Sequence, residues 1–453
     1  MTQKLFGTDG VRGIANKILT PELAFQLGKA LSEVISTQGL GVGLSDKQKT
    51  FILIGKDTRI SGDMLESALI AGICSAGIDV WLPGIIPTPV IAWLTKYTKA
   101  AAGIVISASH NPSEDNGIKF FNSNGYKLSD ELEEKIEELI NNGLKNVSRA
   151  QGPDIGRVYN KKKLVVFYKN FVKQTSDTDL KNWNLLLDTA NGATYKIAPQ
   201  IFKSLNAKVS IINAHPNGNN INYKCGSTHL ESLKKKLKTG NFDIGLAFDG
   251  DGDRLLAVTP EGEEINGDQI MYICARYLPS LKNNHTVVAT VMSNLKFEQK
   301  IKEIKKKFLR TKVGDRYVLE EMINTGALLG GEQSGHIIFP SLSPTGDGII
   351  TAIQFLKAIT VSKQPVSALL KDIRLYPQIL RNVPVVSTRG WDSNTEILKS
   401  VKQAEKELGT HGRVLVRASG TEPKIRIMLE GDNEIQINKL ADILEQDIKN
   451  MYR

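Results

Sequence analysis

The sequence predicts an α/β protein made of three related α/β domains and a smaller C-terminal α+β domain. Two patterns lead to this fold class: a strand–helix–strand pattern that occurs three times, and a final segment with a hairpin-like pattern. The length is the third observation, since 453 residues exceed one ordinary domain and are expected to form two to four. With 41% apolar residues, each domain can bury a core of its own.

The repeated pattern consists of pairs of apolar runs that each end in a polar loop. The first runs cover residues 51–55, 185–188 and 286–290, and the second runs, some 40 to 60 positions later, cover 103–107, 243–248 and 327–330. Helical patterns lie between the runs, for example at 64–76 and 198–205. This alternation predicts α/β units with their chemistry at the strand ends. One long α/β sheet is the alternative that the pattern leaves open.

The last segment differs from the three before it. Its predicted elements are strands at 381–386, 412–417 and 424–429, with a helix at 435–451. The last two strands flank a short turn and form a hairpin-like pair, which is typical of an α+β domain. Loop-forming stretches at 152–156 and 260–262 mark two of the other boundaries. The predicted domains are 1–154, 155–259, 260–370 and 371–453.

The net charge of +10 has two interpretations. Lysines at 232–238 and 302–308 alternate with apolar residues and are typical of solvated helix faces. Nucleic-acid binding is disfavoured, because no recognised motif accompanies the charge and aromatic residues are only 6%. A moderate positive field would equally favour a small anionic substrate.

The three cysteines are odd in number and widely spaced, which indicates a reducing compartment and no disulfide framework. The N-terminus has no signal pattern, and no apolar run is long enough to span a bilayer. We therefore expect a cytoplasmic protein with no membrane partner.

Three carboxylates occur within five positions, where Asp249, Asp251 and Asp253 alternate with glycines. Alternate side chains lie on one side of an extended backbone, so the three can converge on a hard cation such as Mg²⁺ or Ca²⁺. An EF-hand loop is excluded, because its sixth and twelfth positions are here Arg254 and Pro260. An acidic surface turn is the alternative, which the preceding apolar strand makes less favoured.

An apolar, β-branched run ends at two serines, Ser107 and Ser109, followed by a His-Asn-Pro turn. A hydroxyl at the end of a buried strand is held by rigid scaffold on one side and open on the other. A serine presented in this way and a divalent-metal loop in the same chain suggest phosphoryl chemistry. The local pattern alone does not choose between the two hydroxyls.

A turn flanked by arginines predicts a phosphate cradle near the C-terminus. Ser419, Gly420 and Thr421 offer backbone N–H groups and hydroxyls, and Arg417 and Arg426 add forked donors on either side. The glycine spacing and lysine of a Walker A loop are missing, so ATP binding is not expected. An ordinary hairpin turn with two surface arginines is the alternative.

A third motif places Glu332, Ser334 and His336 at alternate positions, where they can line one side of a cleft and bind sugar hydroxyls or an amine. A structural histidine after a glycine is the alternative. Lys119 follows the serine loop closely and could transfer a proton or neutralise charge. Arg12 lies in a glycine-rich loop that could bring it to an anion, or in a plain turn.

A cysteine nucleophile is a further hypothesis, since Cys225 is followed four positions later by His229. The spacing does not establish the necessary geometry, and no third group is evident to orient the histidine. This hypothesis is disfavoured.

Taken in order, these loops resemble those of the α-D-phosphohexomutase superfamily. The serine, aspartate, Gly-Glu-Gln-Ser-Gly-His and Arg-Ala-Ser-Gly-Thr-Glu-Pro loops fall in successive quarters of the chain, so the resemblance covers essentially its whole length. Further details at 6–13, 225–229, 312–317 and Gln333 are similar to bacterial phosphoglucosamine mutases. Phosphomannomutase/phosphoglucomutase relatives typically have methionine at the Gln333 position and Thr-Gly-His at 313–315.

The resemblance implies four domains around a central active-site cleft, each contributing one loop. It selects Ser109, not Ser107, as a phosphoserine whose phosphate holds Mg²⁺ together with the three aspartates. It also implies proton transfer by Lys119 with help from Arg12 and His336, and phosphate binding by the arginine-flanked loop. A homodimer is an expectation from the resemblance alone.

The activity implied by the resemblance is the interconversion of glucosamine 6-phosphate and glucosamine 1-phosphate. A bisphosphorylated hexosamine would be the intermediate and activator, and the product would lead to UDP-N-acetylglucosamine and cell-wall precursors. Three alternatives remain: a phosphomannomutase/phosphoglucomutase, a metal-dependent phosphatase that uses the same carboxylates, and a basic nucleic-acid-binding protein.

Overall fold

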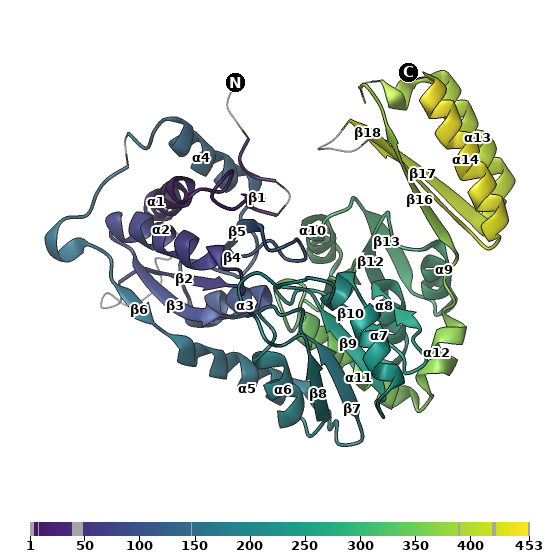
Figure 1. Cartoon of the computed structure of the whole chain (residues 1–453), viewed down its shortest axis with the longest axis horizontal. Coiled ribbons are helices and arrows are strands. Elements are labelled where there is room, and N and C mark those ends of the chain that lie inside the picture. Colours follow the sequence, from purple (N-terminus) through teal and green to yellow (C-terminus); the bar gives the residue numbers. More distant parts are fainter. Residues whose placement is uncertain are drawn as a thin grey trace.

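The computed structural model describes residues 4–7, 9–38, 49–145, 147–387, 390–418 and 423–451, and it folds into four β-sheets in chain order. Figure 1 shows the first unit in purple, the second and third in teal and green, and the C-terminal unit in yellow. The predicted fold class of three α/β units and a smaller C-terminal α+β unit is confirmed. Among the described residues, none of the helices has the length and apolar character needed to cross a bilayer.

The first unit has a six-stranded sheet of order β1-β5-β4-β2-β3-β6. Its strands are β1 (Val11–Ile14), β2 (Phe51–Lys56), β3 (Asp79–Ile85), β4 (Ala102–Ile106), β5 (Asp115–Asn122) and β6 (Val158–Asn160). Its helices are α1 (Pro21–Gln38), α2 (Ser61–Ser75), α3 (Thr88–Thr98) and α4 (Asp130–Asn141).

The second unit has a five-stranded sheet of order β11-β10-β9-β7-β8. Its elements are α5 (Val165–Ser176), β7 (Asn184–Asp188), α6 (Ile197–Ser204), β8 (Lys208–Ile212), α7 (Glu231–Lys238), β9 (Ile244–Phe248), β10 (Leu255–Val258) and β11 (Glu264–Ile265).

The third unit has a four-stranded sheet of order β13-β12-β14-β15. Its elements are α8 (Gly267–Tyr277), β12 (Thr286–Thr290), α9 (Leu295–Glu303), β13 (Lys307–Thr311), α10 (Asp315–Thr325), β14 (Leu329–Gly331), β15 (Ile337–Ile338), α11 (Gly348–Ser362) and α12 (Val366–Asp372).

One strand plan occurs in all three units. A central strand (β2, β7 or β12) pairs in parallel with the next strand on one side and with a third strand (β4, β9 or β14) on the other. The third strand then turns back into an antiparallel partner, β5, β10 or β15. The loop in that hairpin therefore lies at the same place in each unit.

A shared apolar core joins the three units. Alternate residues of each strand face opposite sides of its sheet: Phe51 and Leu53 lie in a buried cluster that also contains Leu185, Leu187 and Val287. The other faces pack separately, against α1 and α2 in the first unit, α7 in the second and α10 in the third. One face of each of these three sheets is thus used to hold the units together.

The predicted boundaries between domains stay predictions, but strand pairing assigns two short strands near them. β6 follows residue 154 and pairs with β3 of the first sheet. β11 follows residue 259 and pairs with β10 of the second sheet.

The C-terminal unit has a three-stranded antiparallel sheet of order β16-β18-β17 and a cluster of buried apolar residues of its own. Its elements are β16 (Gln378–Pro384), α13 (Thr395–Leu408), β17 (Gly412–Ala418), β18 (Lys424–Gly431) and α14 (Glu434–Met451). The sequence indicated the three strands and the last helix but missed α13. Figure 1 shows both helices on one side of the sheet.

Polar contacts join the C-terminal unit to the third unit. Glu430 is fully buried and accepts hydrogen bonds from Leu295 N at 3.0 Å and Arg413 Nε at 2.8 Å. Arg413 Nη2 also donates to Ser293 O at 3.0 Å.

Candidate active site

Three of the four predicted functional loops occupy the repeated hairpin position. The serine loop joins β4 to β5, the aspartate loop joins β9 to β10, and the Gly-Glu-Gln-Ser-Gly-His loop joins β14 to β15. The strand ends that the sequence indicated as places of chemistry are therefore equivalent in the topology. The fourth loop joins β17 to β18 of the C-terminal unit.

Ser109 meets the aspartate loop directly. Its hydroxyl donates a hydrogen bond of 2.6 Å to Asp249 Oδ2, and only 1% of the residue is exposed. Its backbone is left-handed, with φ +52°, a conformation that costs a non-glycine residue about 1–3 kcal/mol. The hydroxyl of Ser107 instead donates to Asp57 Oδ2 at 2.6 Å. The two hydroxyls that the sequence left equivalent thus have different partners.

The three aspartates converge as their spacing predicted. Asp249, Asp251 and Asp253 are buried, and each offers a carboxylate oxygen within 4.8 Å of the others. Asp251 Oδ1 is buried and has no hydrogen-bond partner. A buried lone pair without a donor is costly unless a cation occupies it. Asp253 Oδ1 is also buried without a hydrogen-bond partner. Three carboxylates, two of them with an unused oxygen, fit the ligand preference of Mg²⁺.

Lys119 is the main cation in the aspartate cluster. Its Nζ donates to Asp251 Oδ2 at 2.9 Å and lies 3.1 Å from Asp9 Oδ2 and 3.6 Å from Asp253 Oδ2. Burial lowers the pKa of Lys119, but the surrounding carboxylates outweigh it and raise that pKa above its usual value. Thr88 Oγ1 gives Asp251 Oδ2 a second hydrogen bond, at 2.6 Å.

Burial and neighbouring charges act differently on two carboxyls of the aspartate loop. Burial raises the pKa of Asp249 well above its usual value, and the neighbouring Asp253 and Asp251 raise it further. Burial would also raise the pKa of Asp253, but Lys119, His336 and Arg254 bring it well below its usual range. Two carboxyls of one loop are thus shifted in opposite directions.

A chain of charged groups links the first unit to the third beside this cluster. Lys127 Nζ lies 2.5 Å from Asp9 Oδ1 and 2.7 Å from Asp315 Oδ2. Asp315 Oδ2 in turn lies 3.6 Å from His336 Nε2. Arg12 forms an ion pair with Asp9. Arg12 and Lys119 therefore share Asp9 as a partner.

The predicted sugar-binding residues do not share one environment. His336 is buried, its Nδ1 lies 3.6 Å from Asp253 Oδ2, and its Nε2 accepts a hydrogen bond of 3.2 Å from Gly346 N. Glu332 Oε1 accepts a hydrogen bond of 3.2 Å from Gly314 N. Ser334 is exposed. His336 therefore lies at the aspartate cluster, whereas Ser334 is open to solvent.

The predicted phosphate cradle is described only at its two ends. Arg417 on β17 and Arg426 on β18 are directly opposite in the antiparallel register. Burial lowers the pKa of Arg417, and the neighbouring guanidinium of Arg426 lowers it further. Two guanidinium groups side by side would favour an anion between them. Ser419, Gly420 and Thr421 lie outside the described residues.

Comparison with known proteins decides the family. The four domains of the phosphoglucomutase/phosphomannomutase family match in order: alpha/beta/alpha domain I at 3–147, domain II at 165–262, domain III at 266–376 and the C-terminal domain at 380–446. The chain belongs to the phosphoglucomutase/phosphomannomutase family. The loops described above therefore belong to a member of this family.

Individual relatives agree with the family assignment. The phosphoglucosamine mutase of Desulforamulus reducens is 48% identical over 451 residues, which cover 99% of this chain and 100% of that protein. The structure of a family protein from Burkholderia thailandensis superposes with a TM-score of 0.81 at 23% identity, covering 99% of this chain and 98% of that one. Aspergillus fumigatus N-acetylphosphoglucosamine mutase in complex with GlcNAc-6P and magnesium has a TM-score of 0.61 at 17% identity, with coverages of 94% and 99%. At these identities the two structures support the fold alone.

The cysteine alternative has little support in this family member. Cys225 is buried, and its Sγ lies 3.9 Å from Asn191 Nδ2. Burial, reinforced by Asp188, raises the pKa of the Cys225 thiol to about 12, so a thiolate would be scarce at neutral pH. His229 Nδ1 instead lies 3.1 Å from Thr228 Oγ1.

Several residues that the sequence did not indicate lie around the serine and aspartate loops or contact their neighbours: Asp9, Asp57, Arg59, Thr88, Lys127, Asn222 and Asp315. Asp57 and Arg59 follow a strand that the sequence did predict, so their place at a strand end was a usable signal. Asn222 lies in a loop between β8 and α7 with no local pattern. Only the folded chain brings it to the serine loop.

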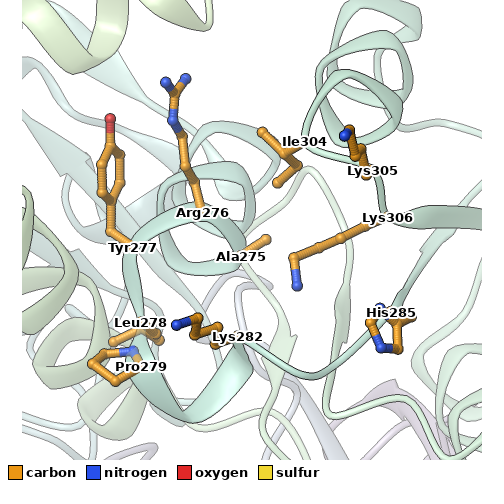
Figure 2. Close-up of a pocket in the computed structure, with 10 residues that line it drawn as sticks. All are labelled: Ala275, Arg276, Tyr277, Leu278, Pro279, Lys282, His285, Ile304, Lys305 and Lys306. Atoms are coloured by element: carbon orange, nitrogen blue, oxygen red, sulfur yellow. The ribbon is translucent and has the colours of Figure 1, made fainter.

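A basic hollow of about 510 Å³ on the third unit shares no residue with this site (Figure 2). Its lining includes Lys282, Lys305, Lys306 and Arg276. Lys306 Nζ already donates to Leu281 O at 2.7 Å, and Arg276 is paired with Asp372. Two of its cations are therefore satisfied by the protein itself.

Proposed function

We propose that this protein is a phosphoglucosamine mutase that interconverts glucosamine 6-phosphate and glucosamine 1-phosphate. The observation that carries the proposal is the 2.6 Å contact between the Ser109 hydroxyl and Asp249 of the aspartate cluster. It supports a serine that carries a phosphoryl group beside a metal. The relative at 48% identity over the whole chain supports glucosamine as the sugar.

Ser109 would begin and end each turnover as a phosphoserine. The phosphoryl group leaves Ser109 Oγ for the free hydroxyl of the sugar monophosphate, whose proton is lost, and a bisphosphorylated hexosamine results. That intermediate turns end over end, its other phosphoryl group returns to Oγ, and a proton is returned to the oxygen left on the sugar. One oxygen of the protein thus exchanges phosphoryl groups with both ends of the sugar.

Asp249, Asp251, Asp253 and the phosphate of Ser109 would hold the Mg²⁺ ion. The donor set and the unused oxygen Oδ1 of Asp251 support this assignment. When bound, Mg²⁺ neutralises charge on the transferring group, which is the principal need of phosphoryl transfer.

The remaining roles are assigned to residues around the serine. Lys119 is the proposed proton-transfer group, with Arg12 and His336 assisting, and the contacts of Lys119 and His336 with the aspartate cluster support this. Glu332, Ser334 and His336 would bind the sugar. The residues proposed for the phosphate that is not being transferred are Arg417, Ser419, Gly420, Thr421 and Arg426.

The proposal includes a cellular role. Glucosamine 1-phosphate would feed UDP-N-acetylglucosamine synthesis for cell-wall precursors, and we place the enzyme in the cytoplasm. A bisphosphorylated hexosamine would serve as activator, because it can phosphorylate a serine that has lost its phosphate.

Coupled assays with glucosamine, glucose and mannose phosphates test the sugar. We expect the highest kcat/KM for glucosamine 6-phosphate. A strong preference for mannose 6-phosphate would show a phosphomannomutase/phosphoglucomutase instead. Net release of inorganic phosphate with no need for a bisphosphate would show a phosphatase.

Substitution of Ser109 tests the phosphate carrier. Ser109→Ala should lower kcat by about 10⁵-fold or more, because the group that carries the phosphate is gone. Mass spectrometry of the wild-type peptide should place phosphate on Ser109. Phosphate on Ser107, or full activity of the Ser109→Ala variant, would refute the assignment.

A further inference from the structure

A closed ring of hydrogen bonds begins and ends on the backbone of Ser109. Ser109 N donates to Ser107 Oγ at 3.0 Å, and Ser107 Oγ donates to Asp57 Oδ2 at 2.6 Å. Arg59 Nε donates to the same Asp57 oxygen at 2.9 Å, and Arg59 Nη2 donates to Ser109 O at 3.0 Å. The side chains of Asp57 and Arg59 are fully buried. The N–H and C=O groups of Ser109 are thus fixed by one continuous network.

Arg59 extends this network over the whole serine loop. Its guanidinium also donates to Asn111 O at 2.9 Å, to Asp115 O at 3.0 Å and to Pro112 O. A planar fork with five N–H donors can serve several carbonyls at once, which a lysine ammonium on a flexible stem cannot do in the same geometry. The loop is therefore shaped around this one side chain.

The second unit holds the same carbonyl from the other side. Asn222 Nδ2 donates to Ser109 O at 2.8 Å and to Asn111 O at 2.9 Å. The backbone of Gly250 also lies against this carbonyl, since a Cβ there would be 2.6 Å from Ser109 O. Ser109 O accepts one hydrogen bond from each of two units.

The equivalent position in the second unit shows that the fold alone does not require such a ring. Asp188 ends β7 much as Asp57 follows β2. It accepts its two shorter hydrogen bonds from backbone groups, Ala190 N at 2.9 Å and Gly226 N at 3.0 Å, and a longer one from Ser232 Oγ at 3.4 Å. In the first unit the corresponding carboxylate is instead used to orient an arginine towards a functional loop.

We propose that Asp57, Arg59, Ser107 and Asn222 are positioning residues that hold Ser109 in its left-handed conformation. This inference rests on the proposed function, in which Oγ must return to one place for phosphoryl transfer at either end of the sugar. If the ring is broken, the left-handed serine can relax towards an ordinary backbone conformation. Oγ then leaves its place beside Asp249, and the alignment for transfer is lost.

Ser107→Ala is the most direct test, because it removes one hydroxyl and two bonds of the ring. We expect kcat to fall about 10²-fold, as for other small misplacements of a reacting group. KM should change less than about threefold, because no proposed sugar contact is touched. Transfer from phosphorylated Ser109 to a sugar phosphate in a single turnover should slow by the same factor.

A matched control exists in the second unit. Ser232 Oγ lies 3.4 Å from Asp188 Oδ2, so Ser232→Ala also removes a hydroxyl next to a buried strand-end carboxylate, but away from the serine loop. Its kcat should stay within about twofold of wild type. Asn222→Ala is a second test variant. It removes the hydrogen bond that the second unit donates to Ser109 O and leaves the ring itself intact.

The rates are expressed per folded molecule, with the folded fraction taken from thermal unfolding. The proposal is overturned if Ser107→Ala and Asn222→Ala both keep kcat within about twofold of wild type, or if their losses vanish after this correction. A wild-type protein that turns over none of the three sugar phosphates would overturn the proposed function, and this inference with it.

Discussion

The serine loop and the aspartate loop occupy the same hairpin position in two related units, yet they are held in different ways. The serine loop is held through its backbone, whose carbonyls accept hydrogen bonds from Arg59 and Asn222. The carbonyls of the aspartate loop instead accept from backbone N–H groups: Thr88 N donates to Asp251 O at 2.9 Å, Ala193 N to Gly250 O at 2.8 Å and Gly348 N to Gly252 O at 3.0 Å. Its carboxylates contact Lys119 and Thr88, and one oxygen each of Asp251 and Asp253 has no hydrogen-bond partner. Both backbones are thus fixed, the serine loop by side-chain donors and the aspartate loop by backbone donors. A loop that presents one covalent position needs a fixed backbone, and a loop that binds a cation needs free lone pairs in addition.

Substitution of Lys119 should have the largest effect, and it acts on the carboxylates of the aspartate loop. Lys119→Met leaves the carboxylates without their main cation, and kcat should fall about 10³-fold because the proposed proton-transfer group is lost. The affinity for Mg²⁺ should increase, although kcat falls. We expect Mg²⁺ to bind at least about tenfold more tightly, because a competing positive charge beside the ligands is gone. Isothermal titration calorimetry would measure this affinity.

Lys127→Met is the control for this experiment. Lys127 is also a cation, with 17% of its side chain exposed, but its ion pairs are with Asp9 and Asp315, not with the three aspartates. Its effect on Mg²⁺ affinity should be smaller than that of Lys119→Met. Weaker Mg²⁺ binding after Lys119→Met would contradict the view that this ammonium competes with the metal.

Gly250 is the point where the two loops touch, and its substitution should have the next largest effect. A Cβ at this position would lie 2.6 Å from Ser109 O and 2.8 Å from Asn222 Nδ2. Gly250→Ala must therefore move the aspartate loop away from the serine, and kcat should fall about 10²-fold. Steady-state kinetics at saturating Mg²⁺ would separate this effect from a change in metal affinity.

Gly62→Ala in α2 is the matched control. Its Cβ would meet only methylene carbons of the flexible Lys56 side chain, the nearest at 3.3 Å. Activity of Gly62→Ala should remain near that of wild type. Equal losses in the two variants would mean that the close approach at Gly250 is not what limits catalysis.

Local patterns were enough to predict the elements that flank the serine and aspartate loops. An apolar run that stops at polar residues located β4 and β9, and alternation with glycine predicted that the three aspartates converge. Both signals lie within a few consecutive residues. The resemblance then chose Ser109 over Ser107, and the observed partners of the two hydroxyls differ in a way that fits this choice.

The residues that hold the serine loop could not be predicted in the same way, because they are common residue types that contact it from distant positions in the sequence. Arg59 reaches Ser109 across 50 positions, and Asn222 reaches it across 113. Neither residue lies in a sequence pattern that indicates its contact with Ser109. The helix α13 differs, because its buried residues Ile397, Ala404 and Leu408 recur at helical spacing and are a local signal.

Asp268 is another buried carboxyl whose pKa is raised by burial, as that of Asp249 is. It lies in the first turn of α8, where Oδ2 accepts a hydrogen bond of 2.7 Å from Asn294 N and Oδ1 is buried without a hydrogen-bond partner. Burial raises the pKa of Asp268 to about 7. The folded protein therefore binds this proton more tightly than the unfolded chain, whose carboxyl has its ordinary pKa of about 4.

The resulting stabilisation is complete below pH about 4 and is lost as the pH rises to about 7. Asp268→Asn cannot ionise, so the free energy of unfolding of the variant relative to wild type should increase over this range by up to roughly 4 kcal/mol. Urea unfolding at pH 4.5 and 7.5 would measure it. Asp372→Asn is the control: pairing lowers the pKa of Asp372, so its contribution is already complete above pH about 4 and its difference from wild type should not change. If the free energies of unfolding of Asp268→Asn and wild type differed by the same amount at both pH values, the pKa of Asp268 would not be raised in the folded protein, and the prediction would be wrong.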